Sequence, residues 1–335
     1  MEFQSDVKVI LCGCGMTGEY FIRYLHQRGA EIVGAIDNNS DLVGKDIGFV
    51  AGLDNPLGVT ISDDPIEVFD SSEANVCIIS VASFMKDVYP FYKLAASEGI
   101  NAISISEEAV YPWNTSPKLS EELDQLAKEN DCTLTTSGYQ DMLCCNMVTS
   151  AAGAAYDIEK ITGVVTGNLG NYGVELADLH GLGLSVESFK EKIVPIYTFP
   201  SFMWNINEWI CAKLNWTVES IDQRVEPIVY QEDIYHKKID RFIPSGNVVG
   251  LSAIVIVITT EGPVVESQCD LKVFVEGEVD VSKWTIHGEP EIDLEVSAMA
   301  LPVTCASTIN RIPQILKAPA GFYTTDKLPI DLFNI

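Results

Sequence analysis

Residues 7–18 read VKVILCGCGMTG, and this stretch decides the fold of the N-terminal half of the chain. Its first six residues are apolar or β-branched apart from one lysine and predict a buried strand, whereas Thr17–Gln27 has the apolar spacing of an amphipathic helix. Between them lies the pattern G-x-G-x-x-G. Gly13 permits a tight turn, Gly15 lets the backbone approach a pyrophosphate, and Gly18 lets the helix pack closely on the strand. The stretch therefore predicts a dinucleotide-binding βαβ unit.

An acidic residue at the next strand end indicates which dinucleotide is bound. Asp37 follows the expected strand Glu31–Ile36, where a carboxylate accepts hydrogen bonds from ribose hydroxyls and repels a 2′-phosphate. Residues 38–40 contain no arginine, so we expect NAD in preference to NADP, although NADP use needs only small loop shifts. Later strand ends should also run beside the cofactor. The expected cofactor-binding residues are Gly13, Cys14, Gly15, Met16, Thr17, Gly18, Asp37, Asn38, Ser80, Val81, Ala82 and Ser106.

The rest of the chain divides into two kinds of pattern. Up to about residue 150, short apolar runs alternate with helical segments, which predicts a Rossmann-type parallel sheet. The expected strands are Val7–Cys12, Glu31–Ile36, Val76–Val81, Ala102–Ile105 and Thr133–Thr136. The expected helices between them are Thr17–Gln27, Lys86–Ser97 and Lys118–Glu129. Residues 151–304 predict an α+β domain with a largely antiparallel sheet, to which long runs such as Val248–Thr260 and Lys283–Val296 belong. Residues 305–335 predict a helix and tail that return to the first domain.

Composition excludes several classes of protein. The chain has 335 residues and a formal net charge of −27, and its five arginines are scattered, so we expect no nucleic-acid or membrane-surface partner. The nine cysteines are few for this length and lie partly in apolar strands, so we expect reduced thiols. Neither a Cys-x-x-Cys pair nor a Cys/His cluster suggests a metal. The start lacks the features of a signal peptide and no apolar run is long enough to cross a bilayer, which leads us to expect a cytoplasmic protein.

Candidate catalytic residues follow the strand Ala102–Ile105, whose end should meet the nicotinamide. The chain continues as Ser106-Glu107-Glu108. The Rossmann portion resembles sugar oxidoreductases and homoserine dehydrogenases, which carry a lysine at the comparable strand end. A carboxylate here suits amine chemistry instead, because it can take the proton of an ammonium and later activate water. The two glutamates can also be an acidic pair at the start of a helix, where the helix dipole stabilises negative charge.

Three longer stretches carry a more specific resemblance: SISEEAVYPW from Ser104, TSGYQDM from Thr136 and TINRIPQILKAPAGFYTTDKLP from Thr308. Over nearly its full length the chain resembles the 2,4-diaminopentanoate dehydrogenases and the native amine dehydrogenases, and its N-terminal part is also similar to dihydrodipicolinate reductase. The resemblance implies NAD(P)-dependent, reversible oxidative deamination of a primary amine to a carbonyl compound plus ammonia. It also implies that Glu108, or else Glu107, is catalytic and that Asn310 lies near the nicotinamide carboxamide.

The substrate pocket is expected around the end of the last Rossmann strand and the start of the second domain. The expected substrate-binding residues are Tyr139, Gln140, Met142, Asn146, Asn168, Tyr172 and His287. With so few arginines to bind a carboxylate, a small ketone or aldehyde and its amine is preferred over a diamino acid, which Arg224, Arg241 or Lys237 would favour. A non-catalytic NAD-binding sensor is the alternative from another class. The long strands of the second domain predict a homodimer.

Overall fold

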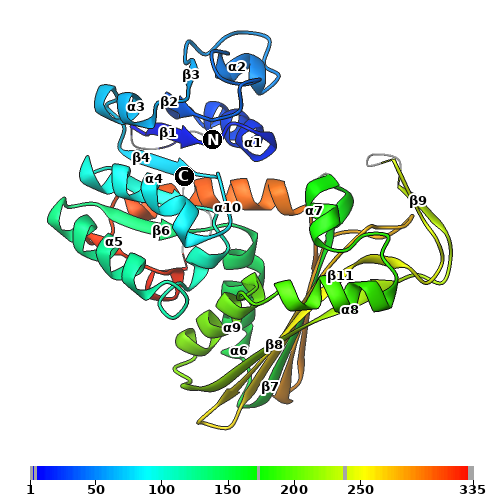
Figure 1. Ribbon diagram of the computed structural model, residues 1–335. Coiled ribbons are helices and arrows are strands. Elements are labelled where there is room, and N and C mark those ends of the chain that lie inside the picture. Colours follow the sequence, from blue (N-terminus) through cyan, green and yellow to red (C-terminus); the bar gives the residue numbers. More distant parts are fainter. Residues whose placement is uncertain (1–2, 4–5, 172–173, 237–239, 331–335) are drawn as a thin grey trace. The chain divides into compact units, whose positions relative to one another are not determined.

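The computed structural model describes residues 3, 6–171, 174–236 and 240–330 (Figure 1). The chain packs into two units, one formed by Met1–Met142 with Leu301–Ile335 and the other by Leu143–Ala300. These limits lie a few residues from the expected boundaries at 150 and 304. Each unit has its own sheet and its own core.

The first unit contains, within its described residues, a seven-stranded sheet in the order β15-β6-β5-β4-β1-β2-β3, and every neighbouring pair is parallel. The order 3-2-1-4-5-6 is that of a Rossmann fold, as the sequence predicts. The strands are β1 (Lys8–Cys12), β2 (Glu31–Ile36), β3 (Ile61–Ser62), β4 (Val76–Ile79), β5 (Asn101–Ser104), β6 (Thr133–Thr136) and β15 (Gly321–Phe322). The helices are α1 (Met16–Gln27), α2 (Ile47–Val50), α3 (Pro65–Ser71), α4 (Met85–Ser97), η1 (Glu108–Val110), α5 (Pro117–Glu129), α10 (Ala300–Ile315) and η5 (Thr325–Lys327), and the π-helical η2 (Gln140–Asn146) leads into the second unit.

Alternating strand residues build a hydrophobic core on each face of this sheet, because successive side chains of a strand point to opposite faces. On one face, Ile10 of β1 packs in a cluster that includes Tyr92 of α4 and Leu123 of α5. On the other, Leu11 packs in a cluster that includes Phe21 of α1 and Ile309 of α10. Both faces of the parallel sheet are covered, and the second one depends on the C-terminal helix (orange in Figure 1).

Several short elements of the first unit were not predicted. Strand β3 has only two residues, too few to show a period of two. Helix α3 did carry a start signal, since Asp64 precedes Pro65 and its side chain accepts hydrogen bonds from the amides of Ile66 and Glu67.

The second unit contains a six-stranded sheet in the order β14-β13-β7-β12-β11-β8, and only the β12–β7 pair of its described strands is parallel. A separate ribbon pairs β9 with β10. The strands are β7 (Asp157–Asn168), β8 (Val218–Val229), β9 (Ile234–His236), β10 (Arg241–Ile243), β11 (Val248–Thr259), β12 (Val264–Lys272), β13 (Val281–Glu289) and β14 (Ile292–Ser297). The helices are α6 (Met147–Ala152), η3 (Leu169–Asn171), α7 (Val174–Leu179), α8 (Val186–Lys192), η4 (Val194–Ile196) and α9 (Phe202–Lys213).

The run Lys283–Val296 belongs to the antiparallel sheet as expected, but it forms two strands, because the chain turns at Glu289–Pro290 and returns as β14, antiparallel to β13. The side chains of β13 alternate between the two faces. Trp284 is fully buried and lies against Gly163 of β7, where a Cβ would come within 2.3 Å of the indole ring. His287 belongs to the other set of alternating positions and therefore lies on the opposite face of the sheet.

All nine cysteines lie in the described part of the chain, and each is a buried thiol. Within the described residues we find no helix whose length and apolar character would let it cross a membrane.

Candidate active site

The glycine loop between β1 and α1 gives each glycine a different geometric task. Gly13 has a φ of +98°, and a Cβ there would lie 2.5 Å from the carbonyl oxygen of Ser80. A Cβ on Gly18 would lie 2.4 Å from the carbonyl oxygen of Gly13, so the helix can pack this closely only with glycine. At Gly15, in contrast, no described atom lies within 4 Å of the position a Cβ would take. At Gly13 and Gly18 there is therefore no room for a side chain, whereas the space beside Gly15 is free of described protein atoms.

The open glycine lies at the N-terminus of α1. Gly15 is the N-cap residue, and among the described residues no side chain caps this helix. The first amide groups of a helix lack intrahelical partners and carry the positive end of its dipole, which favours phosphate groups. Both the space and the donors thus fit a pyrophosphate.

Asp37, at the carboxyl end of β2, is held against the same loop. Its Oδ2 accepts a hydrogen bond of 2.7 Å from the amide of Cys14, and its Oδ1 accepts one of 2.8 Å from the amide of Asn39. The side chain of Cys14 points into the core, where burial raises the pKa of the thiol to about 12, so it remains protonated. Each oxygen of Asp37 keeps a further lone pair with which to accept a hydrogen bond from a ribose hydroxyl.

The loop after β4 lies next to the glycine loop. The Oγ of Ser80 donates to the carbonyl oxygens of Cys12 and Gly13, 3.1 Å from each. The following side chains are accessible, with Val81 39% and Phe84 37% exposed. These residues offer an apolar surface at the carboxyl ends of the strands, where cofactors of this fold bind.

Ser106 does not belong to that surface, and our expectation that it contacts the cofactor is wrong. Its side chain is fully buried, and its Oγ donates to the carbonyl oxygen of Ser83 at 2.7 Å. Its amide donates to the Oγ of Ser104 at 2.9 Å. The serine satisfies the backbone where the chain leaves β5 instead of facing a ligand.

Glu108 is engaged through both carboxylate oxygens. Its Oε2 accepts a hydrogen bond of 2.7 Å from the amide of Met85, the first residue of α4, and its Oε1 accepts one of 2.7 Å from the Oγ of Ser116. Helix α4 has Phe84 at its N-cap and no cap from that residue's side chain. A carboxylate that caps a helix from another element is stabilised by the amide and by the helix dipole. The geometry of Glu108 is that of a structural cap.

Glu107 differs from its neighbour. Its side chain keeps some accessible surface, yet the surrounding protein displaces enough water to raise the pKa of the carboxyl by desolvation. Hydrogen bonds from Ser83 and from the backbone oppose this shift and lower the pKa. A carboxyl whose pKa is moved toward neutrality can both accept and return a proton near the working pH. Glu107 is therefore a candidate for the acid–base residue of the site.

The segment Ser137–Met142, after β6, lies beside helix α10 in the same unit. The amide of Tyr139 donates to the Oγ1 of Thr304 at 3.2 Å, and Tyr139 itself is only 5% exposed. Farther along α10, Arg311 forms an ion pair with Asp141, with 2.7 Å between Nη2 and Oδ2. Gln140 and Met142 are partly exposed. The segment that we expect to line the substrate pocket is thus fastened to the C-terminal helix.

Two known protein families match different parts of the chain. The pattern described as the 2,4-diaminopentanoate dehydrogenase C-terminal domain matches residues 142–333, which is more than half of the chain. The pattern described as the N-terminus of dihydrodipicolinate reductase matches residues 7–105. The chain belongs to the 2,4-diaminopentanoate dehydrogenase family. The resemblance read from the strand-end glutamates and the terminal motif is confirmed.

Individual relatives agree with this membership. A 2,4-diaminopentanoate dehydrogenase from Acetoanaerobium sticklandii is 27% identical, with 97% of this chain and 94% of the relative aligned. The solved amine dehydrogenase from Mycobacterium smegmatis is 34% identical and superposes with a TM-score of 0.91 over 100% of this chain and 99% of that one. A 4-hydroxy-tetrahydrodipicolinate reductase from Sinorhizobium fredii is 38% identical, but over only 21% of this chain and 26% of its own.

The position of Asn310 corrects an expectation taken from the family resemblance. Its Oδ1 accepts a hydrogen bond of 2.6 Å from Nη1 of Arg28, the residue that follows the last turn of α1. The glycine loop is at the other end of that helix. It is the preceding part of α10 that reaches the loop, since the Sγ of Cys305 lies 3.6 Å from the carbonyl oxygen of Thr17. Asn310 therefore does not lie at the nicotinamide end of the site.

Of the expected substrate residues in the second unit, two have defined structural partners. The Oδ1 of Asn168 accepts from the amides of Gly170 and Phe274 and closes the turn after β7. The two ring nitrogens of His287 lie 2.9 Å from the Oγ1 of Thr162 and 3.0 Å from Glu291, so we no longer assign it to the substrate. Asn146 is buried, with 2% of its surface exposed. Tyr172 lies outside the described residues.

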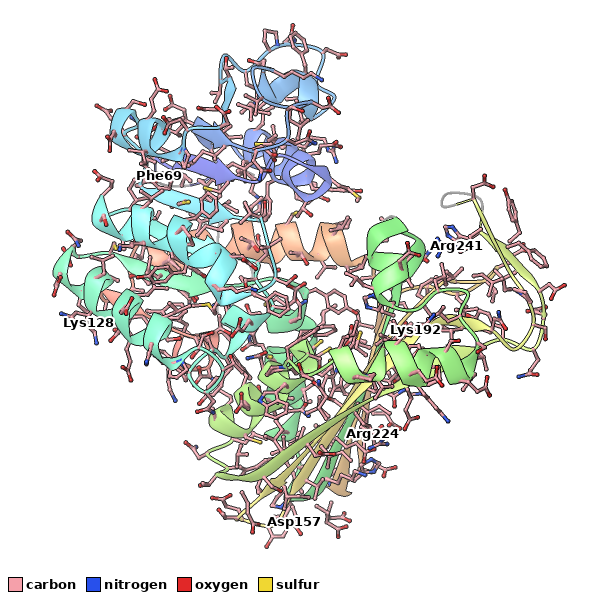
Figure 2. All side chains as sticks on the ribbon, viewed as in Figure 1. Phe69, Lys128, Asp157, Lys192, Arg224 and Arg241 are labelled. Carbon is pink, nitrogen blue, oxygen red and sulfur yellow. The ribbon has the colours of Figure 1, made fainter. Side chains whose placement is uncertain are left out.

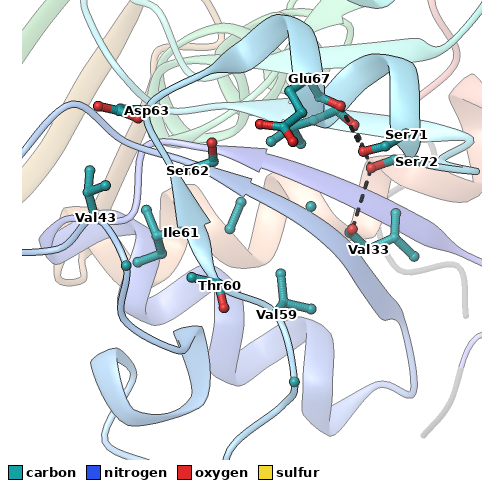
Figure 3. A pocket seen from close by; sticks show the side chains of 15 residues that line it. Val33, Val43, Val59, Thr60, Ile61, Ser62, Asp63, Glu67, Ser71 and Ser72 are labelled. Atoms are coloured by element: carbon teal, nitrogen blue, oxygen red, sulfur yellow. Dashed lines mark hydrogen bonds between the residues drawn. The ribbon is translucent and has the colours of Figure 1, made fainter.

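A cavity of the first unit lies elsewhere. It has a volume of about 450 Å³ and is formed by β2, β3, α3 and the loops around Gly44 and Gly58 (Figure 3). Its described lining residues include neither the glycine loop nor the strand-end glutamates, so it does not contribute to the proposed chemistry. Among the described residues, no group of three or more His, Cys, Asp or Glu side chains is placed to hold a metal ion.

Sequence reasoning missed the residues that hold the site in place. Arg311 falls in the predicted C-terminal helix, whereas Thr304 and Ser116 were given no part in the site. In the structure the hydroxyl of Ser116 donates to Glu108, and its oxygen accepts no cap hydrogen bond from the amides of α5. The spacing of seven residues between Thr304 and Arg311, which places both on one face of α10, was the one signal available.

Proposed function

We propose that this protein is an NAD-dependent amine dehydrogenase that interconverts a small primary amine with a ketone or aldehyde plus ammonia. The single observation that carries the proposal is the desolvated carboxyl of Glu107, at the end of β5 and bonded to the loop that follows β4. A carboxylate rather than a lysine at this position suits an amine, because the substrate arrives as a cation that must lose a proton. Family membership supports the same chemistry, since the relatives described above are amine and diaminopentanoate dehydrogenases.

In the proposed reaction Glu107 moves protons at two stages. Its ionised Oε takes a proton from the substrate ammonium, which leaves the neutral amine. NAD held by the glycine loop and Asp37 would supply the acceptor for the hydride that leaves the carbon atom. Glu107 passes the first proton to solvent, and its carboxylate then takes a proton from the water that adds to the iminium carbon. It returns that proton to the nitrogen, and it takes the hydroxyl proton as the C–N bond breaks and ammonia leaves. A raised pKa suits both directions of transfer, because the carboxyl is then neither a very weak base nor a very strong acid.

The cofactor assignment rests on the first two strands. The open position at Gly15 and the uncapped amides of α1 would hold the pyrophosphate, and Asp37 would accept hydrogen bonds from the adenosine ribose. The exposed residues after Asp37 are Asn38, Asn39 and Ser40, which provide no cation for a 2′-phosphate. These features support NAD as the preferred cofactor.

The preference for a substrate without a carboxylate rests on the arginines. All five interact with groups of the protein itself: Arg23 with Glu19 and Ala51, Arg28 with Asn310, Arg224 with Glu226, Arg241 with Asp178, and Arg311 with Asp141. The two in the second unit, Arg224 and Arg241, lie well apart and cannot form one cluster (Figure 2). A carboxylate is bound most specifically by the paired donors of an arginine, and each arginine here already has an acceptor.

The test is to mix the protein with NADH and a panel of carbonyl compounds, and to follow NADH oxidation with and without ammonium. We expect turnover only with ammonium, and faster with simple ketones or aldehydes than with matched compounds that carry an α-amino acid group. NADH oxidation that does not need ammonium would overturn amine chemistry. Faster turnover of the amino-acid compounds would instead indicate a diamino acid as the substrate, as in the diaminopentanoate dehydrogenases. Tight NADH binding without turnover on any substrate would favour a sensor.

The proposal includes a homodimer. One face of the second unit's sheet is packed against α9, which contacts β11 and β12. The other face carries partly exposed side chains, among them Thr162, Glu266 and His287. A second copy covering that face would bury it, and light scattering of the purified protein measures whether the mass is that of two chains.

A further inference from the structure

One buried ion pair in the first unit has no part in the chemistry proposed above. Arg311 of α10 is 3% exposed and Asp141 is fully buried, and 2.7 Å separates Nη2 from Oδ2. Bringing two charges out of water is costly, and a buried pair often adds little net stability compared with apolar residues of the same size. The ion pair therefore matters for the segments that it holds in place, and not for its net contribution to stability.

The pair belongs to a connected set of polar contacts. The Oγ of Ser137 donates to the Oδ2 of Asp141 at 2.9 Å, and the Nε of Arg311 lies 3.4 Å from that Oγ. The Nη1 of Arg311 donates to Gln314 one turn further along α10, and Gln314 in turn donates to the carbonyl oxygen of Pro329. The guanidinium thus joins the helix and the chain after it to the segment that follows β6.

The same segment is linked to the strand that carries the catalytic glutamate. The amide of Ser137 donates to the carbonyl oxygen of Ser104, the last residue of β5, at 3.0 Å. The Oγ1 of Thr136 donates to that same carbonyl at 2.9 Å. The Oγ of Ser104 accepts from the amide of Ser106, which directly precedes Glu107. A displacement of residues 136–141 would therefore change the position of Glu107.

The conformation of the segment also needs support. Gly138 has a φ of +139°, and the chain then enters the π-helical η2, a form that is rare and frequently found at functional sites. Thr304 contacts this point, both through the hydrogen bond from the amide of Tyr139 and through its methyl group beside Gly138. Thr304 and Arg311 are the two points at which α10 holds the segment.

We infer that Arg311 is a positioning residue, which through Asp141 and Ser137 sets the place of Tyr139 and Gln140 relative to Glu107. This inference rests on the proposed function, in which Tyr139 and Gln140 line the substrate pocket. It assigns to the C-terminal helix a role in substrate recognition, exerted without contact between Arg311 and the substrate.

The test compares Arg311→Met, Arg311→Lys and Asp141→Asn with Arg28→Met as the matched control. Arg28 also bonds to α10, but through Asn310 and from the C-terminal end of α1. In Arg311→Met we expect kcat/KM for the carbonyl compound to fall about 100-fold, the loss associated with a misplacement of about 1 Å. The KM for the carbonyl should rise while the Kd for NADH stays unchanged. Arg311→Lys should recover part of the loss, and Arg28→Met should behave as the wild type.

A merely structural role would give another result. Loss of folded protein lowers the apparent kcat and leaves both KM values unchanged, so that outcome, or an Arg311→Met protein with wild-type kcat/KM, would overturn the inference. If Arg311→Met does not fold, Arg311→Lys and Asp141→Asn carry the same comparison. Hydrogen exchange of peptides over residues 137–142 should be faster in the Arg311 variants and unchanged in Arg28→Met. Should the wild type prove inactive with ammonium, the proposed function fails, and the exchange experiment still decides whether Arg311 holds the segment.

Discussion

The two strand-end glutamates provide the sharpest prediction, because neighbouring residues are expected to respond in opposite ways to the same substitution. Glu107→Gln removes the group that moves protons while keeping its size. General acid–base catalysis contributes about 10²- to 10⁴-fold to a rate, so kcat should fall by that factor, which is about 2.7–5.5 kcal/mol of barrier. Binding of NADH should persist, since the glycine loop and Asp37 are untouched.

Glu108→Gln tests the cap. Glutamine retains an oxygen that can accept from the amide of Met85 and gains an amide that can donate to the Oγ of Ser116, so both contacts survive in altered form. What is lost is the negative charge at the N-terminus of α4, worth about 0.3–1 kcal/mol of the free energy of unfolding. Glu108→Ala loses both hydrogen bonds as well and should be less stable by about 2–3 kcal/mol, on a scale of about 1–1.5 kcal/mol for each bond.

The assay follows NADH oxidation with a carbonyl compound and ammonium for both glutamine variants, together with thermal unfolding and NADH binding by fluorescence. We expect Glu107→Gln to be folded, able to bind NADH and almost inactive, and Glu108→Gln to be active and slightly less stable. The reasoning is refuted if Glu107→Gln keeps about a tenth or more of the wild-type kcat, which is outside the range for a lost acid–base group. It is refuted equally if Glu108→Gln loses as much activity as Glu107→Gln without unfolding.

Three further predictions test the stability of the fold and the cofactor site. Because desolvation raises the pKa of Glu107 above its usual 4.5, the folded protein disfavours the charged carboxylate; Glu107→Gln should therefore raise Tm at neutral pH, with a gain that shrinks as the pH falls and vanishes below 4.5. An equal Tm difference at pH 4 and pH 8 would contradict this. Gly15→Ala should fold normally and weaken NADH binding by about 1–3 kcal/mol in calorimetry, whereas Gly13→Ala should lower Tm through its φ of +98°; equal effects on folding would contradict the loop geometry. Asp37→Ser combined with Asn38→Arg should raise the NADPH-to-NADH ratio of kcat/KM about tenfold or more, since a unit charge at 4 Å is worth about 1–4 kcal/mol; an unchanged ratio would exclude Asp37 as the ribose ligand.

The sequence-based expectations succeeded where local chemistry decides the structure. The roles expected of Gly13 and Gly18 match the contacts that a Cβ would make at each position, because turn geometry and close approach depend on residues only a few positions away. The strand and helix around them follow from apolar periodicity alone. The acid at Asp37 also lies where the spacing placed it, held against the amide of Cys14.

Expectations failed where the role of a side chain depends on a partner that lies far away along the sequence. Glu108 and Glu107 are indistinguishable in sequence, and only the arrival of α4 and Ser116 beside one of them assigns it to a cap. Asn310 looked like a cofactor ligand, but its partner, Arg28, is 282 positions away along the chain. No periodicity or motif records a contact over such a separation.

By itself, the sequence determined the parallel Rossmann sheet, its glycine loop, the acidic residue at the end of β2 and the presence of a carboxylate at the end of β5. These features depend on short-range patterns, in which each residue restricts the backbone or the face of its own element. The tertiary structure alone decided which glutamate is desolvated and which is a cap, and that helix α10 holds the segment around Tyr139 through Arg311. Those outcomes depend on burial and on partners brought together by folding, because desolvation and charge pairing are properties of the packed surroundings and not of the residue.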